Sequence, residues 1–294
     1  MIEGLLFGLF GNLFTTIRGR SLLISILIGG AVAAIAGFAL AAADVHEDVV
    51  ILVPMVVFVV AVVAALILLK KLKLAKLAVT DEQHRQLLIG GFIATSNNER
   101  NDIFKLYKTS RSTAKSMLDS WWDINNPNAA RQTAMELASA QVHTEFADDV
   151  YHNIAKKGIV TPTPNDFVGL KPETAEQDKR IRKGVTCYNK ALKMLKKAGI
   201  TEEDIAGITT LAAWDYGRAA FIARYSAAAK FMTEEEAWPH IQQAAENANA
   251  AYDNWKQYVA AYVIGRAIAY GDVLYIGRGR FSEKSDFARV SFKP

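Results

Sequence analysis

The sequence has little cysteine or histidine and no large excess of either charge. Of its 294 residues, one is cysteine (Cys187) and five are histidine. A single cysteine excludes an intramolecular disulfide and a metal site built from several cysteines of one chain. The formal net charge is +4; residues 1–76 hold six basic and four acidic side chains, which leaves 28 basic and 26 acidic ones in the remainder. A near-neutral main domain is a poor nucleic-acid binder, so we do not expect a nucleic-acid partner.

The short motifs of common enzymes are also missing. The sequence contains no Gly-x-Ser-x-Gly elbow, no phosphate-binding loop and no dinucleotide fingerprint. His143 and His152 are nine positions apart and would face opposite sides of a helix. His152 does share a helix face with Glu145 and with Asp148 or Asp149, but one histidine among acids is a weak metal pattern, and a solvated acidic face is the better interpretation. We therefore predict no metal and no cofactor.

Two long apolar runs dominate the N-terminal part. Residues 21–43 and 49–69 contain no charged side chain. A helix rises about 1.5 Å per residue, so each run would reach about 30 Å, the thickness of the hydrocarbon core of a bilayer. A buried helix of a soluble protein seldom stays apolar on every face for twenty residues. The runs therefore predict two transmembrane helices that form a hairpin within residues 21–76.

Basic residues flank this hairpin on one side only. The flanks carry Arg18, Arg20, Lys70, Lys71, Lys73 and Lys76. The connecting loop has no Lys or Arg and three carboxylates, so the positive-inside rule predicts that both flanks are cytoplasmic. A cleaved secretory signal is an alternative for the first run, since it ends in small residues, but cleavage would not move the C-terminal domain. Within the first run, Gly29 and Gly30 suit either close packing on the second helix or an oligomer interface.

The chain thus divides into three parts. Residues 1–20 are rich in Leu and Phe and are expected to form an interfacial segment at the headgroups. Residues 21–76 form the predicted hairpin, and residues 77–294 form a cytoplasmic helical domain. The predicted fold class is all-α, because no sustained alternating run demands a sheet.

Start and stop signals outline the helices of the C-terminal domain. Thr80, Thr201 and Thr233 each precede an acidic or amide residue by three positions, and Gly199 and Gly271 are typical of helix ends. We expect helices near 80–95, 98–109, 112–122, 127–139, 142–157, 173–198, 202–230, 234–249 and 251–270. Residues 158–172 read as a surface loop, with a lid or a partner-docking loop as the alternative, and residues 272–294 as an extended or mobile tail.

Positive charge is densest at residues 179–197. Eight of these residues are Lys or Arg: 179, 180, 182, 183, 190, 193, 196 and 197. A basic amphipathic helix close to a membrane could contact anionic headgroups. A solvated face balanced by nearby acids is the favoured alternative, and a nucleic-acid patch is a third.

The most distinctive residues are aromatic and arginine side chains on two late helices. Trp214 and Arg218 are four positions apart, with Asp215 three before Arg218, so all three share a helix face. This spacing predicts a semi-buried Asp–Arg network stacked on indole rings. A buried arginine needs a carboxylate, for which the candidates are Asp215 and Glu236. The full candidate cluster is Trp214, Asp215, Arg218, Arg224, Glu236, Trp255 and Arg266.

Four stretches carry a resemblance to a known family. The segments WDYGRAAFIAR, EEEAW and NWKQYVAAYVIGRA, with the earlier SMLDSWWDINNPNAARQTAMELASAQVHTEF, resemble the bacterial domain-of-unknown-function family numbered 1266, which has YbeU- and YbeR-like members. The resemblance covers roughly residues 115–271; Val142 departs from the glycine that members usually have before the early histidine. It implies a helical domain and a bacterial source, hence an inner (cytoplasmic) membrane, and it implies no reaction.

Three functions remain open at this point. The first is a membrane-anchored interaction or regulatory module, with the lipid bilayer and a protein as partners and anionic lipid as a further candidate. The second is an enzyme or toxin-like effector that uses the Asp/Arg/Trp cluster on an anionic substrate, with Asp215 as a base. The third is a membrane-perturbing or immunity protein that acts through its hairpin.

Overall fold

A computed structural model describes residues 19–42, 47–75, 77–141, 144–156, 162–163, 175–273, 281–282 and 285–294. Nearly all of the expected interfacial segment 1–20 and of the expected loop 158–172, together with Arg18, Lys76 and His143, lies outside these residues. The chain divides into two compact units, Met1–Ala78 and Val79–Pro294. The described residues form helices and no β-strand, which confirms the all-α class.

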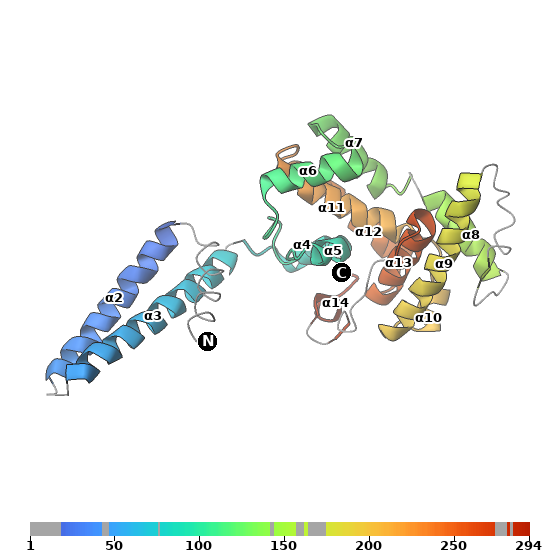
Figure 1. The fold of residues 1–294 in the computed structure, drawn as a ribbon. Helices are drawn as coiled ribbons and strands as arrows, with labels where there is room; N and C mark the ends of the chain where they lie inside the picture. Colours follow the sequence, from blue (N-terminus) through green and yellow to red (C-terminus); the bar gives the residue numbers. More distant parts are fainter. Residues whose placement is uncertain are drawn as a thin grey trace. The chain divides into compact units, whose positions relative to one another are not determined.

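The N-terminal unit is a pair of antiparallel helices, α2 (Gly19–Ala42) and α3 (Glu47–Ala75), shown side by side in Figure 1. Gly29 lies against α3: a Cβ atom added there would be 2.4 Å from Val62 Cγ2 and 3.2 Å from the carbonyl oxygen of Phe58. A Cβ atom on Gly30 would meet nothing within 4 Å. Of the two glycines, Gly29 therefore serves the close approach of the helices, and Gly30 faces away from α3.

Apolar side chains are exposed along both helices. Leu27 and Ile35 of α2 and Val60 of α3 are between 62% and 71% exposed. The stretch Val53–Leu72 of α3 is long and apolar enough to cross a membrane, and little of it is buried. The apolar stretch of α2 among the described residues, Ile24–Ala36, is shorter. One helix therefore meets the requirements of a span by length and composition, and the second span stays a prediction.

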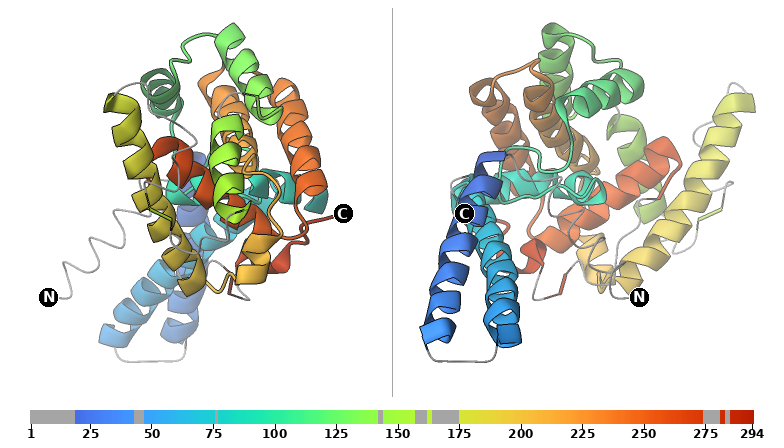
Figure 2. Two further views of the ribbon diagram at one scale, coloured as in Figure 1. Left: turned by 90° about the vertical axis from the view of Figure 1, so that its right-hand side faces the viewer. Right: turned by 60° about the vertical axis from the view of Figure 1, so that its left-hand side comes forward.

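The C-terminal unit is built around two helices, α11 (Ala213–Ala229) and α13 (Trp255–Tyr270), in which almost every residue is buried. Three helices pack on α11: α6 (Arg111–Trp122), α7 (Pro127–Ala138) and α12 (Glu234–Ala251). Three others pack on α13: α8 (Thr144–Lys156), α9 (Ala175–Lys197) and α10 (Glu202–Ala206) (Figure 2). The short helices α4 (Asp81–Ile89) and α5 (Gly91–Ser96) contact α11, and α14 (Asp286–Arg289) lies near the C-terminus.

Most helix boundaries follow the capping signals of the sequence. The side chains of Thr80, Thr201 and Thr233 each accept a hydrogen bond from the backbone N–H three residues later, and all three form capping boxes. Gly199 follows α9 with φ +85° and Gly271 ends α13 with φ +64°, in the left-handed region that favours glycine. These predictions are confirmed.

The helix expected over residues 98–109 is wrong, because these residues form an irregular segment between α5 and α6. Glu99 is buried, and its carboxylate accepts hydrogen bonds from the backbone N–H groups of Lys108 (3.1 Å) and Thr109 (2.7 Å), and also from that of Tyr107. A carboxylate that binds three successive N–H groups satisfies donors that a helix would otherwise pair with carbonyl groups. The segment therefore keeps its non-helical shape.

The single helix expected over 202–230 is also wrong, since α10 ends at Ala206 and α11 begins at Ala213. Between them, Gly207 lies against the side-chain amide of Gln257 of α13, which would have to move if residue 207 had a Cβ atom. The tail differs from expectation as well: its described part packs on α13, with the ring centroids of Phe287 and Phe292 at 5.2 Å and 4.8 Å from that of Trp255.

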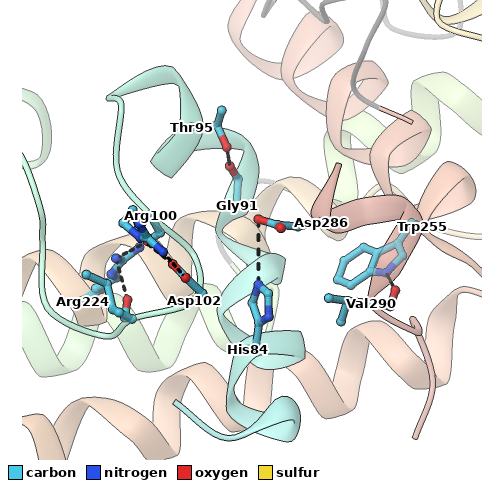
Figure 3. Close-up of polar contacts among 10 residues, drawn as sticks. His84, Gly91, Thr95, Arg100, Asp102, Arg224, Trp255, Asp286 and Val290 are labelled. Carbon is cyan, nitrogen blue, oxygen red and sulfur yellow. Dashed lines mark hydrogen bonds and ion pairs between the residues drawn. The ribbon is translucent and has the colours of Figure 1, made fainter. Parts of the chain in front are cut away.

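Polar contacts also hold this tail (Figure 3). Trp255 Nε1 donates a hydrogen bond to the carbonyl oxygen of Val290 (2.8 Å). Asp286 of α14 faces His84 of α4 at 3.8 Å, and this contact lowers the pKa of Asp286. The C-terminal segment is therefore part of the packed unit.

The two adjacent glycines of α2 allow a matched test of helix pairing. We expect Gly29→Val to destabilise the helix pair by about 1–3 kcal/mol, because the new side chain would overlap Val62. Gly30→Val should change stability by less than about 0.5 kcal/mol. Thermal unfolding of the full chain in detergent, followed by circular dichroism at 222 nm, measures both. Equal effects at the two positions would contradict the packing described.

Candidate functional site at the buried arginines

The seven candidate residues come from α11, α12 and α13, and the structure places them in four different surroundings. Trp214, Asp215, Arg218 and Arg266 share interactions at one end of α11 and α13. Arg224, Glu236 and Trp255 each have separate neighbours. The single constellation expected from the sequence is therefore divided.

Arg218 occupies the centre of the first group. Its guanidinium forms an ion pair with Asp215, and its Cζ atom lies 3.5 Å from the centroid of Trp214 and 5.6 Å from that of Trp122. The side chains of Asp215 and Arg218 are 1% and 8% exposed. This confirms the predicted Asp–Arg network stacked on indole rings. The sequence argument missed Trp122, which comes from α6 and has no spacing relation to α11.

Burial and neighbouring charges set the electrostatics of Arg218. Desolvation lowers its pKa to about 9, Tyr262 opposes this shift, and the like charge of Arg266 adds to it. At neutral pH the guanidinium therefore stays charged. Tyr262 is fully buried, and burial raises its pKa to about 12. The network thus has two arginines in electrostatic contact and one buried carboxylate.

Arg266 lies at the exposed edge of this group. It donates a hydrogen bond to Asp272 (2.7 Å) and its Cζ atom lies 5.5 Å from the ring centroid of Tyr270. The hydrogen bond lowers the pKa of Asp272. Gly265 permits a close approach of the two helices, because a Cβ atom there would be 3.0 Å from the carbonyl oxygen of Leu211 and 3.2 Å from Trp214 Cβ. The group is held by close packing of α13 on the start of α11.

Arg224 is satisfied by backbone carbonyl groups. Its Nε donates to the carbonyl oxygen of Phe104 (2.7 Å), and its Nη2 donates to those of Ile103 (2.9 Å) and Arg100 (Figure 3). The expected carboxylate partner is therefore present at Arg218, where it is Asp215, whereas Arg224 is bound by main-chain carbonyl groups. Burial lowers the pKa of Arg224 to about 10, and the negative charge of Glu99 opposes this shift. Arg224 and Glu99 together satisfy the polar backbone of residues 100–109.

Glu236 and Trp255 have structural surroundings of their own. Glu236 is exposed, accepts a hydrogen bond from Arg131 Nη2 (2.8 Å), and closes the capping box of α12 with Thr233. Of the two candidate partners for a buried arginine, Asp215 takes that role at Arg218, while the position of Glu236 at the first turn of α12 directs it to the surface. Trp255 packs beneath the C-terminal tail, as described above.

The acidic face of α8 is also used for structure. Asp148 accepts hydrogen bonds from Thr210 Oγ1 (2.7 Å) and from the backbone N–H of Leu211 (2.5 Å), and a ring nitrogen of His152 lies 2.8 Å from the carbonyl oxygen of Thr209. Burial raises the pKa of Asp148. The prediction of a solvated acidic face is therefore wrong at Asp148, whose hydrogen bonds hold the connection between α10 and α11. Across the described ranges, no three His, Cys, Asp or Glu side chains are placed to hold a metal ion.

The burial and pairing of the Arg218 group limit the chemistry that it can carry out. Asp215 is held by a guanidinium and is almost fully buried, so it is a poor general base, which must reach a substrate proton within hydrogen-bond distance. A guanidinium stacked on indole and paired with a carboxylate is, in contrast, a stabilising arrangement in a protein interior. The geometry favours a structural role for this group.

These features define a class of protein: an all-α chain with an apolar N-terminal helix pair and a helical C-terminal unit organised around buried arginines. A family model described as "Protein of unknown function (DUF1266)" matches residues 117–274, which is more than half of the chain. The chain therefore belongs to this family, and the resemblance found over 115–271 is confirmed. No curated protein and no solved structure matches the chain.

The structural role of the Asp215–Arg218 pair predicts a large loss of stability when it is broken. We expect Asp215→Asn to lower the free energy of unfolding of residues 79–294 by about 3–5 kcal/mol, because it leaves a buried charge without its counterion. Asp253 is exposed and paired with Lys293, so Asp253→Asn should cost less than about 1 kcal/mol. Urea unfolding followed by tryptophan fluorescence compares the two variants. Similar losses would contradict the structural role.

Proposed function

We propose that this chain is a membrane-anchored helical protein whose C-terminal unit acts as an interaction or regulatory module. The observation that carries the proposal is the exposure of apolar side chains along α3. Val53–Leu72 is a 20-residue apolar stretch, and its outward side chains include Val56, Val60 and Leu68. Water is a poor solvent for a surface of this kind, whereas lipid tails solvate it.

The charges beside α3 support an orientation. Lys70 and Lys71 are exposed at the end of the apolar stretch that leads into the C-terminal unit. The positive-inside rule favours the cytoplasmic side for such residues. We therefore propose that α2 and α3 both cross the cytoplasmic membrane, with the N-terminus and the C-terminal unit in the cytoplasm.

The side chains of the polar cluster are buried and engaged with one another, which fits an interaction role better than a catalytic role. Asp215 and Arg218 are engaged with each other and with indole rings, which leaves little access for a substrate. The described part of the C-terminal unit instead exposes large side chains that proteins commonly use in interfaces: Trp121, Met135 and Tyr270, which are 63%, 58% and 66% exposed. Trp121 and Tyr270 are the first candidates for contact with a protein partner.

Fractionation and a topology reporter test the anchor. We expect the full chain to stay in the membrane fraction after a high-salt or carbonate wash and to dissolve only with detergent, because apolar contact does not weaken with salt. A reporter fused after Pro294 should be active only in the cytoplasm. A chain that stays in solution without detergent, or a reporter active outside, would overturn the anchor.

Site-specific photo-crosslinking tests the interaction role. A photoreactive amino acid at Trp121 or Tyr270 should capture a defined partner in intact cells, since both side chains are exposed. The same amino acid at Gln243, an exposed polar position of α12, is the control and should capture nothing above background. Identical patterns from all three positions would remove these aromatic residues as interface candidates.

A further inference from the structure

The helix α9 carries a continuous row of basic side chains on its outer side. Its six members lie within about 100° of one another around the helix and are all exposed: Lys179, Arg182, Lys183, Lys190, Lys193 and Lys197. We refer to these six side chains as the basic face. From Lys179 to Lys197 the face extends about 27 Å along the helix.

The orientation of the basic face is fixed by the other side of the helix. Val185, Tyr188, Ala191 and Leu195 are buried there, and α9 packs on α13 (Figures 1 and 2). Gly184 supports this contact, because a Cβ atom there would lie 3.1 Å from the carbonyl oxygen of Ile268. The basic face is therefore held outward by the core.

Four lysines of the basic face take part in no ion pair of the described residues: Lys183, Lys190, Lys193 and Lys197. Glu176 is exposed one turn before the first lysine, and Asp272 is already paired with Arg266. Asp272 and Lys183 still attract each other, and the exposed acids Glu202 and Glu203 follow α9, so the balance of this region by nearby acids stays a prediction.

An open pocket of about 580 Å³ lies at the middle of the basic face. Arg182, Lys183, Thr186 and Lys190 line it from α9, and Gly271 and Asp272 line it from the end of α13. The side-chain stem of Lys183 packs on Gly271, where an added Cβ atom would come within 3.0 Å of Lys183 Cδ. Basic side chains and a hydroxyl around an open depression suit a phosphate-bearing headgroup.

We propose that the basic face binds anionic phospholipid headgroups of the membrane in which the same chain is anchored. This inference rests on the proposed anchor. Five residues, 76–80, connect α3 to α4, and an extended chain of that length spans at most about 18 Å. A tether this short gives the C-terminal unit a high effective concentration at its own membrane, so individually weak contacts suffice.

The same tether favours lipid over nucleic acid as the ligand of the basic face. The sequence after residue 76 has 28 basic and 26 acidic side chains, so the unit as a whole offers nucleic acid little long-range attraction. A bilayer, in contrast, presents a plane of negative charge to which the short connection ties the unit. Each lysine near such a surface strengthens binding about fivefold at low salt.

Lysine acetylation of the full chain, reconstituted in nanodiscs, tests the proposal with an internal control. Discs of phosphatidylcholine alone are compared with discs that also contain phosphatidylglycerol, and mass spectrometry reads the rate at each lysine. We expect Lys190, Lys193 and Lys197 to react at least about fivefold more slowly in the anionic discs. Lys105, Lys108 and Lys115, which are exposed elsewhere on the unit, should react equally in both. High salt should abolish the difference.

Two variants of equal charge extend the test. Replacing Lys190, Lys193 and Lys197 by Gln should remove the protection of Lys183, and replacing Lys105, Lys108 and Lys115 by Gln should keep it. Equal acetylation rates of the basic face in the two discs would overturn the proposal. The proposal would also be overturned if duplex DNA protected these lysines in neutral discs while anionic lipid did not. Failure of the chain to enter any disc would instead refute the anchor, so the two failures are distinguishable.

Discussion

The C-terminal unit depends on the satisfaction of two charged groups inside its most buried helix. α11 carries Arg218 and Arg224 in a position where almost every neighbour is apolar. An unpaired charge in such surroundings is very unfavourable, so the fold must bring a partner to each arginine. Asp215 and two indole rings serve Arg218, and three carbonyl groups serve Arg224. The positions of α6 and of the segment before it follow from these requirements.

The sequence predicted local features well because they depend on neighbours in the chain. Thr80, Thr201 and Thr233 mark their helices through contacts within three residues, and the Asp215–Arg218 pair is an i,i+3 relation on one turn. The interactions that the sequence missed join distant segments. Glu99 prevents a helix over 98–109 by binding residues eight to ten positions later, and Asp148 interrupts the expected helix at 202–230 from more than sixty residues away. No periodicity or capping pattern encodes these contacts.

Family membership and the all-α class could thus be predicted, whereas the composition of the candidate site could not. Seven residues looked like one cluster because their types were alike and their helices adjacent in the sequence. In the structure, Glu236 and Trp255 stabilise a helix start and a C-terminal segment, and Arg224 faces a different segment from Arg218. The charge on α9 was predicted in part. The sequence located the high density of basic residues, but only the packing of α9 on α13 determines which side of the helix faces outward.

The way in which Arg224 is satisfied has a consequence for how the family can vary. Its hydrogen bonds go to the main chain of residues 100, 103 and 104, and every amino acid supplies a carbonyl group at those points. Substitutions that keep Ile103 and Phe104 apolar would leave the contact intact, while the arginine itself has no substitute that reaches all three acceptors. Comparison of sequences alone would therefore find no covarying polar partner for this arginine.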